Sequence, residues 1–81
     1  ERIGKMELEI KELLEEVKPG EDFDGSKTYV DDGILDSFDI ISLVNMLEEK
    51  YSIEIDGLDI IPENFQNTES IIHLIEKSKK A

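Results

Sequence analysis

The residue best placed to do chemistry in this chain is Ser37, which lies between Asp36 and Asp39 where an irregular segment gives way to a helical one. A serine needs a partner base to act as a nucleophile, and the one histidine, His73, lies among apolar residues near the end of the chain. With no cysteine there is no thiolate nucleophile or thiolate metal ligand, so an enzyme is not expected. A hydroxyl at a helix start can instead carry a phosphoester, because free N–H groups and the helix dipole favour an anion there.

A second candidate site is the segment DFDGSKTYVDDG, residues 22–33, in which oxygen-bearing side chains alternate as in an EF-hand calcium loop: Asp22, Asp24, Ser26 and Thr28. The match then fails. An EF-hand needs glycine at the sixth position and glutamate at the twelfth, where this chain has Lys27 and Gly33. We therefore expect no selective metal site.

Negative charge is the strongest feature of the composition. The formal net charge is -12 over 81 residues, and residues 21–56 contain eleven acidic residues against two basic ones. Nucleic acid is not an expected partner, because binding to phosphate backbones needs lysine and arginine. A field of this sign favours basic protein partners and speeds their encounter.

The sequence contains no apolar run long enough to span a membrane and no signal-peptide pattern at its start. The absence of cysteine fits a reducing compartment. These features predict a cytoplasmic protein without a membrane span. We also expect a monomer that forms a single domain over residues 1–81.

The first half of the chain predicts two helices joined by a long loop. Apolar residues recur at helical spacing over about residues 3–17, and Pro19-Gly20 ends this amphipathic segment. The second helix is expected over about residues 37–50, with Asp36 or Ser37 as its N-cap. The irregular stretch between them carries apolar residues that we expect to pin it across the helices: Phe23, Tyr29, Val30, Ile34 and Leu35.

The second half predicts shorter elements and a last helix. Ser52–Ile55 alternates polar and apolar residues, which indicates a brief extended segment, and a short helical turn is expected around Asp59–Asn64. Thr68 is expected to cap a helix over about residues 69–79. The predicted fold is all-α: a small bundle of three main helices plus one short helix, with a long first loop.

The second helix can be divided into two faces at about 100° per residue. Leu43, Met46 and Leu47, flanked by Ile40 and Val44, form the expected core side. Phe38 and Ile41 fall on the opposite side, which should be exposed to solvent. Acidic residues lie around them: Asp39, Glu48 and Glu49. An apolar spot with a charged rim predicts a docking surface. The alternative is that the long loop folds over Phe38 or Ile41.

The segments DDGILDSFDIISLVNMLEEKYSIEI and IPENFQNTESIIHLIEK, with the amphipathic start and the long acidic loop, resemble the acyl and peptidyl carrier protein family over nearly the whole chain. The resemblance implies that Ser37 carries 4′-phosphopantetheine through a phosphoester, with Asp36 and Asp39 at the flanking motif positions. The group would supply the thiol that the chain lacks and hold its cargo as a thioester.

The same resemblance implies partners rather than catalysis. A magnesium-requiring phosphopantetheinyl transferase would attach the group from coenzyme A, an acyl- or aminoacyl-loading ligase would charge it, and downstream acyl-processing enzymes with basic docking surfaces would use it. The second helix is the main recognition element of that family, so the expected contacts are Phe38, Ile41, Glu48 and Glu49.

Two positions depart from the pattern of fatty-acid carriers. Phe38 stands where they have leucine, and Ser42 stands where they have an acidic residue. The form GILDSF is more similar to stand-alone carriers, such as D-alanyl carrier proteins. The alternative function is an unmodified acidic helical module that binds a basic partner through the helix after Ser37.

Overall fold

The computed structural model describes residues 2–79, which form three α-helices: α1 (Arg2–Val17), α2 (Ser37–Tyr51) and α3 (Thr68–Ser78). Two short 3-10 turns, η1 (Gly57–Asp59) and η2 (Pro62–Phe65), lie between α2 and α3. No strand occurs within residues 2–79, so the predicted all-α class is confirmed. In the same range, no helix is long and apolar enough to cross a membrane.

Each helix contributes one apolar stripe to a single core, with residues three and four apart, as an amphipathic helix requires. The buried apolar residues of the helices are Ile10 and Leu14 of α1, Ile40, Leu43, Val44 and Leu47 of α2, and Ile71, Ile72, Leu74 and Ile75 of α3. Phe65, from η2, is fully buried among them. The core is therefore shared by all three helices and by the segment that joins the last two.

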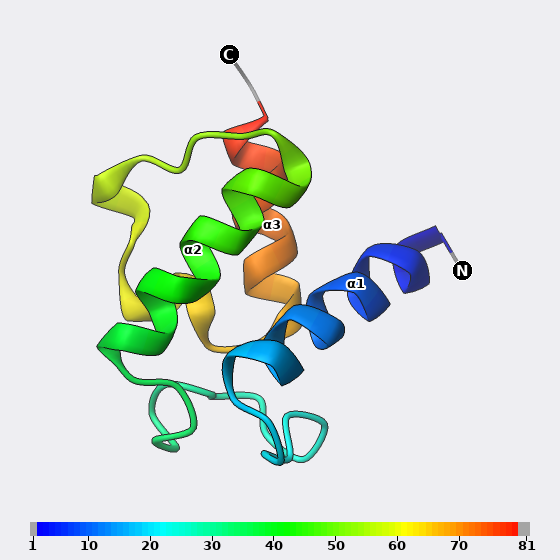
Figure 1. The fold of residues 1–81 in the computed structure, drawn as a ribbon, viewed down its shortest axis with the longest axis vertical. Helices are drawn as coiled ribbons and strands as arrows, with labels where there is room; N and C mark the ends of the chain where they lie inside the picture. Colours follow the sequence, from blue (N-terminus) through cyan, green and yellow to red (C-terminus); the bar gives the residue numbers. More distant parts are fainter. Residues whose placement is uncertain (1, 80–81) are drawn as a thin grey trace.

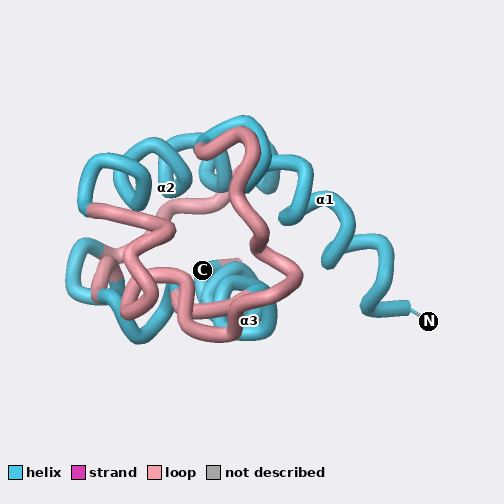
Figure 2. The backbone as a smooth tube through the Cα atoms, turned by 90° about the horizontal axis from the view of Figure 1, so that it is seen from below, coloured by secondary structure: helices cyan, strands magenta, loops and turns pink. Residues whose placement is uncertain are grey.

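The helices are arranged around the C-terminal half of α1, which packs against both α2 and α3, while α3 also packs against η2. The N-terminal half of α1 projects from the rest of the molecule in both views (Figures 1 and 2). The long loop between α1 and α2 closes one end of the bundle, at the bottom of Figure 1. Ser37, at the first turn of α2, is therefore at the loop-covered end.

The long loop is held by buried side chains, as the sequence predicted. Phe23, Tyr29 and Leu35 are buried, and Val30 and Ile34 are partly buried against the core. The rings of Phe23 and Tyr29 meet edge to face, with centroids 5.1 Å apart. The amide of Tyr29 donates to the carbonyl of Gln66 at 2.6 Å, and the side chain of Gln66 accepts from the amide of Val30 at 3.1 Å. These contacts join the loop to the start of α3.

The segment after α2 was expected to be briefly extended over Ser52–Ile55. Ser52 instead adopts a left-handed conformation, with φ 54°, at the C-cap of α2, and residues 53–55 form neither helix nor strand. The short helical turn expected around Asp59–Asn64 is found as two separate 3-10 turns, η1 ending at Asp59 and η2 beginning at Pro62, with a break at Ile60 and Ile61. Ile61 is extended and precedes Pro62, and the proline ring disfavours a helical conformation for the residue before it.

The predicted cap of the last helix is also wrong. The N-cap of α3 is Asn67, whose side chain accepts from the amide of Ser70 at 2.8 Å. Thr68 is instead the first residue of the helix and is buried. Its hydroxyl lies 2.9 Å from that of Tyr29, so the side chain is used in a tertiary contact.

Candidate functional site

Ser37 is exposed at the first position of α2, and the residues on both sides fix it there. Before it, Leu35 is buried and its amide donates to the carbonyl of Tyr29 at 3.1 Å. After it, Ile40 is buried in the core. Since both neighbours are anchored on the inner side, the serine between them is left facing solvent.

A reciprocal capping box begins α2, which assigns the N-cap to Asp36 rather than Ser37. The Asp36 carboxylate accepts from the amide of Asp39 at 2.9 Å, and the Asp39 carboxylate accepts from the amide of Asp36 at 3.0 Å. The first N–H groups of a helix have no carbonyl partner within it. Ser37 therefore stands at a helix start whose position is fixed and whose free amides can donate hydrogen bonds to an anion.

Asp39 also forms an ion pair with Lys18, the residue that follows α1. The Nζ atom of Lys18 lies 3.0 Å from Oδ2 of Asp39. Partial burial works against ionisation of Asp39, but the Asp36 amide and the Lys18 ammonium outweigh it and hold the pKa of Asp39 below its ordinary value. The hydrogen bond to Asp39 and the charge of that carboxylate raise the pKa of Lys18. Both groups are therefore charged at neutral pH.

Two apolar side chains lie exposed on α2 within about a turn of Ser37. Phe38 is 84% exposed and Ile41 is 53% exposed. The long loop does not cover them, so the alternative in which it buries one or both is wrong. The predicted solvent-exposed apolar surface beside Ser37, formed by Phe38 and Ile41, is confirmed. Its role in docking remains a prediction.

The three acidic residues predicted to surround this spot, Asp39, Glu48 and Glu49, are not equally accessible. Glu49 is exposed and available to a partner, as is Asp36, which directly precedes Ser37. Glu48 is instead half-buried, and its Oε2 atom accepts from the amide of Ile55 at 2.9 Å, which holds the chain after α2 against the helix. Asp39 is turned toward Lys18. Met46, expected in the core, is only half-buried.

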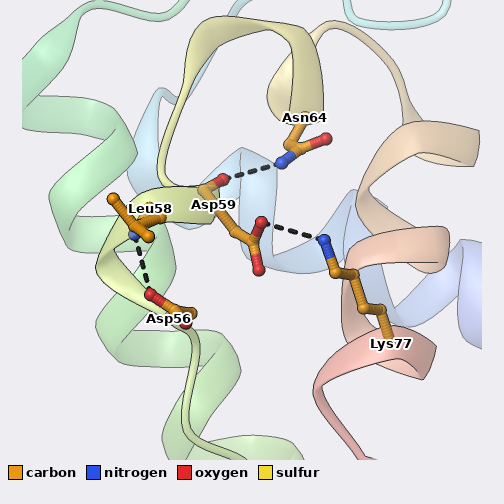
Figure 3. A network of polar contacts seen from close by, with 5 residues as sticks. All are labelled: Asp56, Leu58, Asp59, Asn64 and Lys77. Carbon is orange, nitrogen blue, oxygen red and sulfur yellow. Dashed lines mark hydrogen bonds and ion pairs between the residues drawn. The ribbon is translucent and has the colours of Figure 1, made fainter.

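Sequence reasoning did not identify a further exposed apolar residue, Leu58 of η1, which is 84% exposed. Figure 3 shows the polar contacts that hold this turn: the Asp56 carboxylate accepts from the amide of Leu58 at 2.9 Å, and the Asp59 carboxylate pairs with Lys77 at 2.9 Å. Asn64 donates to the carbonyl of Asp59 at 2.7 Å. The turn signal Asp56-Gly57 was visible in the sequence, but the ion pair that anchors it to α3 was not.

A hollow on the described surface lies between α1, the long loop and the start of α3, away from α2. Its volume is about 320 Å³, and charged and polar side chains line much of it, including Lys11, Asp24 and Asn67. None of the lining residues belongs to the segment that contains Ser37. Among residues 2–79, no group of three or more histidine or carboxylate side chains is arranged to hold a metal ion.

Comparison of the chain with protein-family models, with curated proteins and with solved structures found no match. The function must therefore be inferred from the residues and geometry around Ser37.

Proposed function

We propose that this chain is a carrier protein that holds an acyl or aminoacyl group as a thioester on 4′-phosphopantetheine attached to Ser37. The observation that carries the proposal is that Ser37 is exposed at the first turn of a capped helix, directly beside Phe38, which is 84% exposed. A modification site must be open to a second protein. A docking site must offer that protein apolar surface next to the reacting atom.

The residues around Ser37 fit a phosphoester. The amides of Ser37 and Phe38 belong to the first turn of α2, where N–H groups lack helical partners and the dipole is positive, so they favour the oxygens of a phosphate. The prosthetic group supplies a thiol when attached, and the chain has no cysteine of its own. Asp36 and Asp39 are engaged in the capping box, so we expect the transferase to supply the base that takes the proton of Ser37.

The proposal also assigns roles to the surface of α2. Phe38 and Ile41 would enter an apolar recess of the partner, and the exposed carboxylates of Asp36 and Glu49 would meet its basic side chains. The formal net charge of -12 would speed encounter with a basic surface. The expected partners are a phosphopantetheinyl transferase, a loading ligase and the acyl-processing enzymes that follow.

The test is the intact mass of the chain after incubation with coenzyme A, magnesium and a broad-specificity phosphopantetheinyl transferase. The wild type should gain one phosphopantetheine, and Ser37→Ala should gain none. Ser42→Ala is the matched control, because Ser42 is an exposed serine of the same helix and its removal should leave the gain intact. A folded, initially unmodified wild type that gains nothing would contradict the proposal.

The second candidate is an unmodified acidic module that binds a basic partner through α2. The exposure of Phe38 and Ile41 and the negative charge favour it equally, since neither depends on a modified serine. Its binding would weaken as salt concentration rises and would be the same for Ser37→Ala as for the wild type. Dependence on Ser37 therefore distinguishes the two functions.

A further inference from the structure

One carboxylate oxygen holds two separate parts of the chain at the start of α2. Oδ2 of Asp39 accepts from the amide of Asp36 at 3.0 Å and lies 3.0 Å from Nζ of Lys18. The side chain of Asp39 is only 14% exposed, so this contact is shielded from water on most sides. The ionised form of a shielded carboxylate depends on a neighbouring cation for its stability more than that of an exposed carboxylate does.

Lys18 directly follows the last residue of α1, so its ion pair joins the end of α1 to the first turn of α2. The intervening loop is anchored elsewhere, through Tyr29 and Gln66, to the start of α3. Those anchors fix the loop against α3, and the buried side chains of Leu35 and Ile40 hold the two ends of the segment that contains Ser37. Between them, the polar contacts that hold the first turn of α2 are its capping box, formed by Asp36 and Asp39, and the ion pair with Lys18.

We propose that Lys18 is a positioning residue of the Ser37 site. The ammonium group of Lys18 pairs with the Asp39 carboxylate and keeps it hydrogen-bonded to the amide of Asp36. This contact sets the conformation in which Ser37 is exposed to solvent. The inference rests on the proposed function, and it deepens that function by assigning to α1 a part in presenting the serine.

The two aspartates beside Ser37 then have different roles. The carboxylate of Asp39 is paired with Lys18 and largely shielded from solvent. Asp36 is exposed, although one of its carboxylate oxygens accepts from the amide of Asp39. A basic partner can approach Asp36 from solvent. To reach Asp39 it would have to displace a lysine of the chain itself.

The experiment compares Lys18→Met with Lys11→Met as substrates of the transferase. Lys11 pairs with Asp24 at 2.9 Å, so both variants lose one positive charge and one ion pair, but Lys11 has no contact with the start of α2. Lys18→Met is expected to lower kcat about threefold to tenfold, because the reacting hydroxyl is less well placed. Lys11→Met should keep the wild-type kcat, and Lys18→Arg should restore most of it.

Three results would overturn the inference: equal kcat for the two methionine variants, an effect of Lys18→Met on KM alone, or no recovery in Lys18→Arg. Circular dichroism at the assay temperature would first establish that each variant is folded. A wild type that takes up no phosphopantetheine contradicts the proposed function instead. In that case amide hydrogen exchange at Asp36 and Asp39 tests the contact by itself, and faster exchange in Lys18→Met than in Lys11→Met is the expected result.

Discussion

The hydroxyl groups of Tyr29 and Thr68 lie 2.9 Å apart in a buried position and join the long loop to the first residue of α3. Either hydroxyl can be the donor. Because both residues are buried, each hydroxyl gives the other a hydrogen-bond partner that it would otherwise lack. The pair therefore couples the loop that leads to Ser37 with the helix on the other side of the core.

Removal of both hydroxyls from this pair should cost less than the two single removals added together. Tyr29→Phe leaves the Thr68 hydroxyl without its partner and should lower the free energy of unfolding by about 1–3 kcal/mol. Thr68→Val should have a similar effect. The double variant should lose less than the two single losses combined, because no unpaired hydroxyl remains. Urea denaturation of the four proteins measures this, and strictly additive losses would mean that the two groups do not interact.

The buried positions of α2 were predictable, because its apolar residues follow the helical period. Leu43 and Leu47 are fully buried as expected, and the exposure of Phe38 and Ile41 follows from the same period. The local sequence limited the N-cap to Asp36 or Ser37, and the capping box with Asp39, three residues on, selects Asp36. These features depend on contacts between near neighbours in the chain.

The features that were missed depend on contacts between distant residues. Asn67 and Thr68 can both cap a helix, and the buried hydroxyl of Tyr29 decides which of them does. The ion pair of Lys18 with Asp39 spans a long loop whose path no local pattern specifies. Glu48 was expected on a solvent-exposed face, but its carboxylate accepts a hydrogen bond from the backbone amide of Ile55.

The ion pair at the start of α2 predicts a defined dependence of stability on pH. The pKa of Asp39 is lower in the folded chain than its ordinary value of 3.8, so ionised Asp39 stabilises the fold at pH values above 3.8. That contribution is lost as the pH falls below 3.8 and through the lower folded value. Asp39→Asn should therefore be less stable than the wild type at about pH 7 and nearly equal to it at about pH 2, where protonated aspartate resembles asparagine.

Urea denaturation at the two pH values measures the difference. Asp24→Asn is the matched control, since Asp24 also pairs with a lysine but is well exposed, and exposed ion pairs contribute little. Its midpoint should match that of the wild type at both pH values. A loss in Asp39→Asn that is equally large at low pH would show that the charge of Asp39 is not what stabilises the fold.

The exposed ring of Phe38 predicts an effect on recognition without an effect on folding. Phe38 is 84% exposed, so Phe38→Ala removes few contacts within the chain and should change the free energy of unfolding by less than about 0.5 kcal/mol. If the ring enters a recess of the transferase beside Ser37, its loss should raise KM about tenfold with kcat little changed, since truncation of a central apolar contact costs about 1.4 kcal/mol or more. Leu8→Ala is the control, because Leu8 is an exposed apolar residue of α1, 62% exposed, outside the predicted docking face. Equal KM values for Phe38→Ala, Leu8→Ala and the wild type would exclude the face beside Ser37 as the docking surface for this enzyme.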